Sequence, residues 1–126
     1  MSTKAVITKD FTFAAAHHLT GIPADHQCAR IHGHGYTIRV QIAGAVIGPG
    51  WVVDYGELNG FSSWIDTHLD HRDLNEVLPI NPTAENLAGH LLLVLRSTLA
   101  STTDLDEISV GVSETPKTWA WVSEQW

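Results

Sequence analysis

The chain has 126 residues, of which 44% are hydrophobic and 17% are charged, and its formal net charge is −7. This length predicts one domain, residues 1–126, and this composition is typical of a folded globular protein. The acidic balance, without a cluster of lysine and arginine, argues against nonspecific nucleic-acid binding. No apolar run approaches the roughly 20 residues that span a bilayer, and residues 1–10 contain no apolar signal segment, so we expect a cytoplasmic protein without membrane contact.

Alternating apolar and polar residues predict two long strands near the start of the chain. The first covers residues 5–16 and the second covers residues 32–44, with a loop containing glycine and proline at 19–30 between them. A Gly-Pro-Gly sequence at 48–50 predicts a turn that returns the chain to residues 51–53. We expect these three strands to be antiparallel.

Three histidines lie at the ends of the apolar faces of the first two strands. His32 and His34 are separated by one residue, so in a strand they project to the same side, about 7 Å apart. His17 shares the parity of the apolar residues of the first strand and ends that face. Three imidazoles at one end of a sheet suit Zn²⁺ and leave its fourth position open for water or substrate. The alternative is three ordinary surface or core histidines.

Cys28 lies in the loop, four residues before His32, and the sequence leaves its role open. As a fourth ligand it would close the metal site and make the ion structural. As a base it would draw a proton from a substrate that the metal holds. A small buried hydrophobic residue is the third interpretation.

From Glu57 onward the apolar residues recur every three or four positions, which predicts amphipathic helices. The first helix begins near Glu57 and carries Leu58, Phe61, Ile65 and Leu69. The second covers residues 84–99, and Thr83 is placed to cap its N-terminus.

The alternation of a strand returns at residues 107–115. Glu114 continues the apolar face of this strand, and an unpaired buried carboxylate is costly, so we expect it to meet a metal, a cation or the donor groups of a ligand. Residues 119–122 also resemble a strand. The order of strands, two helices and more strands predicts an α+β domain with both helices on one face of an antiparallel sheet.

Six short segments are spread over nearly the whole chain. They are F-x-A-A-H-x-L at 13–19, C-x-x-x-H-G-H at 28–34, VVDYGEL at 52–58, LDHRDLN at 69–75, NPTAENLA at 81–88 and VSET at 112–115. In this order they resemble the 6-pyruvoyltetrahydropterin synthase and 6-carboxytetrahydropterin synthase family. The resemblance implies the tunnelling (T-) fold, with homo-oligomers (trimers, usually stacked as hexamers) and active sites between subunits.

The resemblance also implies a role for each candidate residue. The Zn²⁺ ligands fall on His17, His32 and His34, and the base on Cys28. The proton relay falls on Asp70 and His71, the pterin anchor on Glu114, and Thr83 lines the pterin pocket. The implied substrate is a small molecule, dihydroneopterin triphosphate. The residues fit this chemistry, because a Lewis acid, a thiol and an Asp-His pair suit proton transfer on a hydroxylated carbon chain.

Members of this family form one of two products. Some eliminate triphosphate to give the pyruvoyl pterin, and others also split the side chain to give 6-carboxytetrahydropterin and acetaldehyde on the way to deazapurines such as queuosine. The short interval from Cys28 to His32 favours the carboxy product, whereas His18, Tyr55 and Trp121 depart from common residues of the family. Two alternatives are a non-catalytic zinc module closed by Cys28 and a metal-independent dihydropterin aldolase of the same fold.

Overall fold

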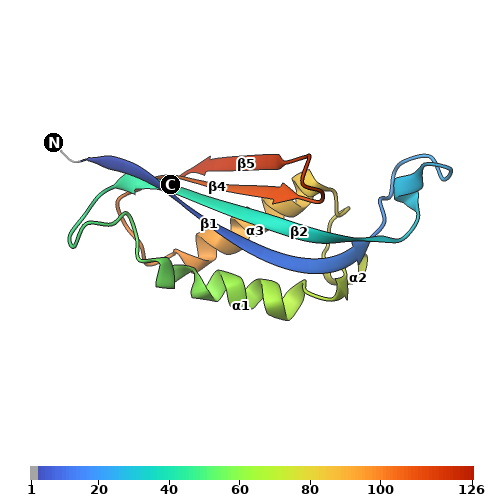
Figure 1. Cartoon of the computed structure of the whole chain (residues 1–126), viewed down its shortest axis with the longest axis horizontal. Helices are drawn as coiled ribbons and strands as arrows, with labels where there is room; N and C mark the ends of the chain where they lie inside the picture. Colours follow the sequence, from blue (N-terminus) through green and yellow to red (C-terminus); the bar gives the residue numbers. More distant parts are fainter. Residues whose placement is uncertain (1–2) are drawn as a thin grey trace.

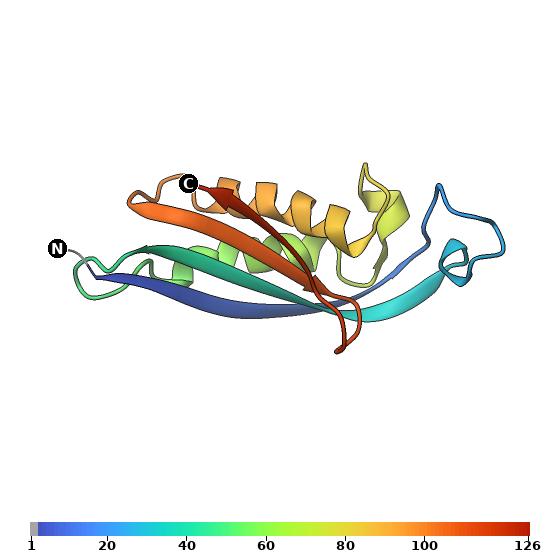
Figure 2. The same cartoon turned by 90° about the horizontal axis from the view of Figure 1, so that it is seen from above.

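The computed structural model describes residues 3–126, which form one sheet and a layer of helices (Figure 1). The strands are β1 (Lys4–His17), β2 (His32–Ala45), β3 (Arg72–Asp73), β4 (Leu105–Ser113) and β5 (Ala120–Gln125). The helices are α1 (Asn59–His68), α2 (Leu74–Val77) and α3 (Ala84–Thr98), with short 3₁₀ turns η1 (Gln27–Ala29) and η2 (Tyr55–Leu58). The α1 and α3 helices lie along the same face of the sheet (Figure 2), so the predicted α+β class is confirmed.

The sheet has the order β3-β1-β2-β4-β5. Strands β1 and β2 pair antiparallel over their whole length, from Lys4 opposite Ala45 to His17 opposite His32. The β2–β4 and β4–β5 pairs are also antiparallel. The short β3 strand is parallel to β1, with Arg72 opposite Ala15, so the sheet is not wholly antiparallel as the sequence predicted.

The core lies between the sheet and the two long helices. Strands β1, β2 and β4 give alternate side chains to it, because successive residues of a strand point to opposite faces. The following core residues are 0–1% exposed: Tyr36, Ile38, Val40, Ile42, Phe61, Ile65, Leu87, Leu91, Leu95, Ile108, Val110 and Val112. This alternation also sets the direction of the residues at the strand ends, and it places His17, His32 and His34 on the helix side of the sheet.

The prediction of a strand at residues 51–53 is wrong. Trp51 forms only an isolated bridge with Ile47. Val52 and Val53 are both buried, at 2% and 6% exposure, whereas neighbouring residues of a strand point to opposite faces. The chain then turns into η2, where the Asp54 side chain accepts a hydrogen bond from Gly56 N. The first long helix therefore begins at Asn59, two residues after the predicted start.

The second long helix begins where the sequence predicted. The hydroxyl of Thr83 accepts a hydrogen bond from Asn86 N at 3.1 Å, which confirms it as the N-cap of α3. Neither this helix nor any other between residues 3 and 126 is long and apolar enough to cross a membrane.

Candidate metal centre and active site

Three histidines converge where the β1–β2 ladder ends. His17 pairs with His32, and His34 lies one pleat inside on the same face of the sheet. One ring nitrogen of each imidazole lies within 4.8 Å of those of the other two. The antiparallel register brings together residues from two strands, and the shared parity then directs all three side chains to one point.

Two backbone carbonyls orient two of the imidazoles. The Nδ1–H of His17 donates to the carbonyl of Pro82 at 2.7 Å, and the Nδ1–H of His32 donates to the carbonyl of Arg30 at 2.7 Å. With the proton on Nδ1, each Nε2 carries only a lone pair. These two Nε2 atoms are 3.0 Å apart, so two acceptors face each other without a hydrogen between them. A cation bound between the two nitrogens would resolve this contact.

The third imidazole presents the same requirement. His34 Nε2 is buried and has no hydrogen-bond partner among the described residues. Burial lowers the pKa of both His17 and His34, which keeps them in the neutral form that binds metals. Three neutral imidazole nitrogens, two of them in direct contact, form a donor set that fits a metal ion such as zinc, copper, iron or nickel.

Glu114 follows the end of β4 and faces this group. Its carboxylate oxygens lie 3.9 Å from His17 Nε2 and 3.8 Å from His34 Nε2, which is beyond hydrogen-bond distance. The side chain is half-buried and accepts no hydrogen bond within residues 3–126. It lines a cavity of about 360 Å³ together with Thr83, Leu19 and Trp119. A half-buried carboxylate with both oxygens free can therefore accept donors from a ligand in this cavity.

Cys28 lies in η1 and is not part of the three-histidine group. Its backbone N–H donates to His26 Nδ1 at 3.0 Å, and its carbonyl accepts from Leu19 N at 2.7 Å. The loop that carries it projects past the end of the sheet, away from α1 and α3 (Figure 1, Figure 2). This position gives no support to Cys28 as a fourth metal ligand.

Asp70 and His71 form an ordered pair beside the edge of β1. Asp70 accepts hydrogen bonds from Ala14 N and from His71 Nδ1, each at 3.0 Å. The bond from Ala14 N and then the bond from His71 lower the pKa of Asp70. Because Nδ1 is held by the carboxylate, Nε2 of His71 is the free acceptor.

His71 itself is held in an unusual backbone conformation and points outward. Its φ is 58°, in the left-handed region, and its N–H donates to the Ala14 carbonyl. The side chain is 82% exposed. Beside it, small residues of β1 and β2 line a hollow of about 490 Å³ that also includes His34. The exposed imidazole is thus free to meet a substrate or a second chain.

Several groups that shape this site could not be predicted from the sequence. The carbonyls of Pro82 and Arg30 set the histidine tautomers, and a backbone carbonyl leaves no pattern in the sequence. The phenol of Tyr36, buried beneath the imidazoles, lies 3.3 Å from His17 Nδ1, and burial raises its pKa. Tyr36 lies within the alternation predicted for residues 32–44, but nothing in the sequence indicated its contact with a metal ligand.

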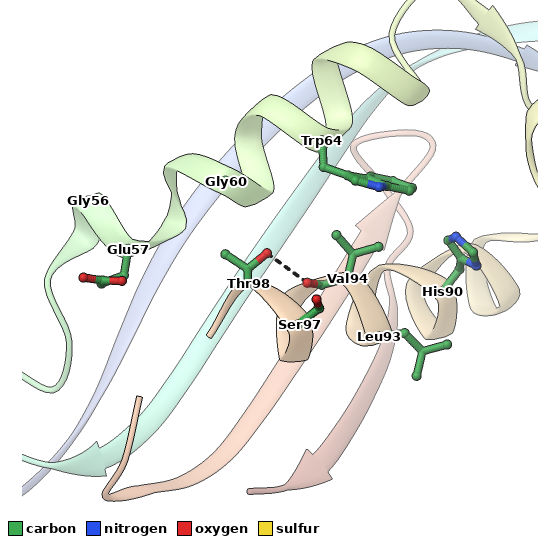
Figure 3. Close-up of a pocket in the computed structure, with 9 residues that line it drawn as sticks. All are labelled: Gly56, Glu57, Gly60, Trp64, His90, Leu93, Val94, Ser97 and Thr98. Atoms are coloured by element: carbon green, nitrogen blue, oxygen red, sulfur yellow. Dashed lines mark hydrogen bonds between the residues drawn. The ribbon is translucent and has the colours of Figure 1, made fainter. Parts of the chain in front are cut away.

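A separate hollow of about 600 Å³ lies between α1 and α3 (Figure 3). Trp64 of α1 reaches over it toward α3, where His90, Leu93 and Thr98 line the opposite side. It contains none of the predicted site residues. The three histidines and Glu114 are therefore the better candidate site, because their polar groups converge without partners.

Comparisons with known proteins give a consistent result. The sequence model of a family described as 6-pyruvoyl tetrahydropterin synthase matches residues 6–125. A protein of Archaeoglobus fulgidus, provisionally named 6-carboxy-5,6,7,8-tetrahydropterin synthase, is 33% identical over 120 residues, which are 95% of this chain and 96% of that one. A Synechocystis protein named 6-carboxy-5,6,7,8-tetrahydropterin synthase is 33% identical over 97 residues, 71% of this chain and 74% of its own. A Pyrococcus furiosus protein named dihydroneopterin monophosphate aldolase is 31% identical and covers 85% of this chain and 89% of its own.

Solved structures show the same fold. The 6-pyruvoyl tetrahydropterin synthase of Caenorhabditis elegans superposes with a TM-score of 0.80 at 24% identity, over 99% of this chain and 97% of that one. The Plasmodium falciparum protein of the same name superposes with a TM-score of 0.81 at 20% identity, over the full length of both chains. At these identities the likeness establishes the fold, and it confirms the predicted T-fold.

Proposed function

The chain belongs to the 6-pyruvoyl tetrahydropterin synthase family, and we propose that it is a 6-carboxy-5,6,7,8-tetrahydropterin synthase. The reaction converts 7,8-dihydroneopterin triphosphate and water into 6-carboxytetrahydropterin, acetaldehyde and triphosphate, a step toward deazapurines such as queuosine. The observation that carries this proposal is the convergence of three imidazoles beside an unbonded carboxylate. The relatives at 33% identity that bear this name support the carboxy product over the pyruvoyl product.

The metal of this site is zinc in our proposal, held by His17, His32 and His34. Imidazole nitrogen is a ligand that zinc prefers, and the lone pairs of His17 and His32, 3.0 Å apart, already face each other. Bound there, zinc would supply Lewis acidity that acidifies a hydroxyl group or polarises a carbonyl. The chain's own contribution is to hold the rings in the correct tautomer through the carbonyls of Pro82 and Arg30.

Glu114 anchors the pterin ring in this proposal. The pterin edge presents adjacent N–H groups, and a carboxylate with two free oxygens accepts them as a pair of charge-assisted hydrogen bonds. The cavity that Glu114 shares with Thr83 lies on the metal side of the sheet, so a pterin held there directs its side chain toward the histidines. The hydroxyl of Thr83 already serves α3 as an acceptor, which fixes it as part of the cavity wall.

Cys28, Asp70 and His71 move protons in this proposal. Cys28 acts as the base that takes a proton from the substrate side chain, and the free Nε2 of His71 takes up or returns a proton at a neighbouring carbon. Asp70 holds the His71 tautomer, because its carboxylate accepts from Nδ1 at 3.0 Å and leaves Nε2 as the nitrogen that faces the substrate.

The active site is shared between chains of a homo-oligomer, a trimer or hexamer, in our proposal. The outer edges of β5 and of β1 between Lys4 and Phe13 have no strand partner within residues 3–126, and such edges favour pairing with another copy. The exposed His71 and the projecting Cys28 loop would then meet across the contact. The hollow that includes both His34 and His71 offers the alternative of a site within one chain.

A second candidate function is aldol cleavage of a dihydropterin. The relative named dihydroneopterin monophosphate aldolase supports it, since that protein is 31% identical over most of both chains. An aldolase would release the two-carbon fragment with its phosphate ester intact. The proposed synthase instead releases inorganic triphosphate and acetaldehyde.

The test of function is mass spectrometry of the products from 7,8-dihydroneopterin triphosphate with zinc-loaded protein. We expect 6-carboxytetrahydropterin and acetaldehyde in equal amounts, and Cys28→Ala serves as the control for nonenzymatic conversion. If the pyruvoyl pterin is the end product, the protein is a 6-pyruvoyltetrahydropterin synthase and the assignment as a 6-carboxytetrahydropterin synthase is wrong. A phosphorylated two-carbon aldehyde would assign the aldolase reaction.

The test of the shared site is complementation between Cys28→Ala and His71→Ala. Each variant alone should be nearly inactive. Random mixing of equal amounts in a closed ring should recover about a quarter of wild-type activity, because each residue of a shared site is intact with a chance of about one half. Mixed oligomers that form, as verified by mass spectrometry, and show no activity would place both residues of the site in one chain.

A further inference from the structure

The backbone of residues 18–20 remains hydrogen-bonded beyond the end of β1, although no strand among residues 3–126 pairs with it there. His18 N donates to the side-chain oxygen of Asn75, and the Asn75 amide group donates back to the His18 carbonyl, both at 2.9 Å. Thr20 N donates to the side-chain oxygen of Asn81, and the Asn81 amide group donates back to the Thr20 carbonyl, both at 2.9 Å. Two asparagine side chains therefore each bind both backbone groups of one residue.

This arrangement reproduces the pairing of a strand edge. A carboxamide offers one acceptor and a donor side by side, like the N–H and C=O that a strand residue presents to its neighbour. His18 and Thr20 are two residues apart, so their backbone groups point to the same edge. The same edge of β1 is paired with β3 at Ala15 and Ala16. The two asparagines thus continue the contact that β3 begins.

Leu19, the residue between His18 and Thr20, is hydrogen-bonded to Cys28. Leu19 N points to the opposite edge and donates to the Cys28 carbonyl at 2.7 Å, which closes the loop from Leu19 to Cys28. Cys28 N is bonded in turn to His26 Nδ1. The backbone of Cys28 is therefore bonded to Leu19, and the residues on either side of Leu19 are held by the asparagine carboxamides.

We propose that Asn75 and Asn81 are positioning residues for Cys28, acting by clamping residues 18–20 as an extra piece of strand. The catalytic consequence of this clamp rests on the proposed function, in which Cys28 is the base. The clamp itself can be measured without substrate, because Cys28 is the only cysteine of the chain and alkylation reports on it alone.

The first test needs no substitution. In the zinc-loaded wild-type protein, the amides of His18, Leu19 and Thr20 should resist hydrogen exchange to an extent comparable with the last residues of β1. Asp25, in the middle of the loop, is the internal comparison and should exchange rapidly. Rapid exchange at His18 and Thr20 would overturn the clamp.

The second test compares Asn75→Ala with Asn59→Ala, which changes an exposed asparagine of α1. Loss of two hydrogen bonds should raise the open population of the loop, and hence the rate of Cys28 alkylation by iodoacetamide at 25 °C, about tenfold (~1.4 kcal/mol). Asn59→Ala should react at the wild-type rate. Asn75→Asp, which keeps the acceptor for His18 N and loses the donor, is the second variant should Asn75→Ala not fold.

Zinc content and melting temperature are measured for the same variants, so that opening of the loop can be distinguished from unfolding of the whole protein. With zinc retained, an alkylation rate equal to wild type in Asn75→Ala or Asn75→Asp would overturn the proposal. A faster rate with a lower kcat and an unchanged KM supports the clamp together with the role of Cys28 as base. A faster rate with unchanged kcat supports the clamp and overturns that role of Cys28.

Discussion

Removal of the metal should lower the melting temperature of the protein, and His32→Ala should abolish this effect. The Nε2 atoms of His17 and His32 lie 3.0 Å apart, and that of His34 is buried without a partner. Without a cation, the folded protein keeps facing lone pairs and one unsatisfied buried nitrogen. The unfolded chain has neither cost, because water solvates each ring. A metal bound in the proposed site should therefore stabilise the folded state selectively.

The size of the effect follows from the binding equilibrium. A free zinc concentration 100 times the dissociation constant stabilises the folded state by about 2.7 kcal/mol. An unfolding entropy of about 2.1 cal/mol/K per residue, over 126 residues, converts this to about 10 °C. The expected difference between zinc-loaded and chelator-treated wild-type protein is thus about 10 °C.

The assay is thermal unfolding with and without chelator, with metal analysis of the same samples. Wild type and Cys28→Ala should each carry about one zinc per chain and show the full difference, whereas His32→Ala should carry none and show no difference. Equal melting temperatures of loaded and chelated wild type would refute the metal centre. Loss of zinc in Cys28→Ala would instead indicate a structural site with Cys28 as the fourth ligand.

Three further predictions concern the surroundings of this centre. Glu114→Gln should weaken pterin binding by about 1.5–3 kcal/mol per lost charge-assisted bond while zinc is retained, and unchanged affinity by calorimetry would assign Glu114 a structural role. Burial lowers the pKa of His17 and His34 in the folded protein, so as the pH falls the unfolded chain takes up protons before the folded protein does. The metal-free protein should therefore lose stability below about pH 6.5, and equal urea midpoints at pH 7.5 and 5.5 would contradict this. Thr83→Ala should cost about 1 kcal/mol through loss of the α3 cap and Thr83→Ser much less, and an unchanged urea midpoint for Thr83→Ala would contradict a stabilising cap.

Much of the fold was predictable because burial imposes a period on the sequence. The alternation in residues 5–16 and 32–44 predicted β1 and β2 to within one residue at each end. The same parity placed His17, His32 and His34 on one face, since a strand allows no other direction. The family resemblance, confirmed by the match over residues 6–125, supplied the T-fold, which no periodicity could show.

The errors occurred where pairing depends on distant residues. Val52 and Val53 have the composition of a strand, but both side chains enter the core, which an irregular turn permits and a strand does not. The two residues of β3 are too few for any period. Their place beside β1 depends on Asp70 and His71 binding the backbone of Ala14.

The clustering of His17, His32 and His34 could be predicted from the sequence, but the geometry of the cluster could not. The pattern H-x-H predicted a metal site, yet the tautomer of His17 is set by the Pro82 carbonyl, 65 residues away in the chain. Likewise, the Asp70–His71 pair was visible in the sequence, whereas the 82% exposure of His71 was not. In the proposed mechanism, the imidazole of His71, which is bonded to Asp70 and otherwise open to solvent, needs a partner from outside its immediate surroundings. In the proposed arrangement a second copy of the chain supplies that partner, so assembly is itself a condition for activity.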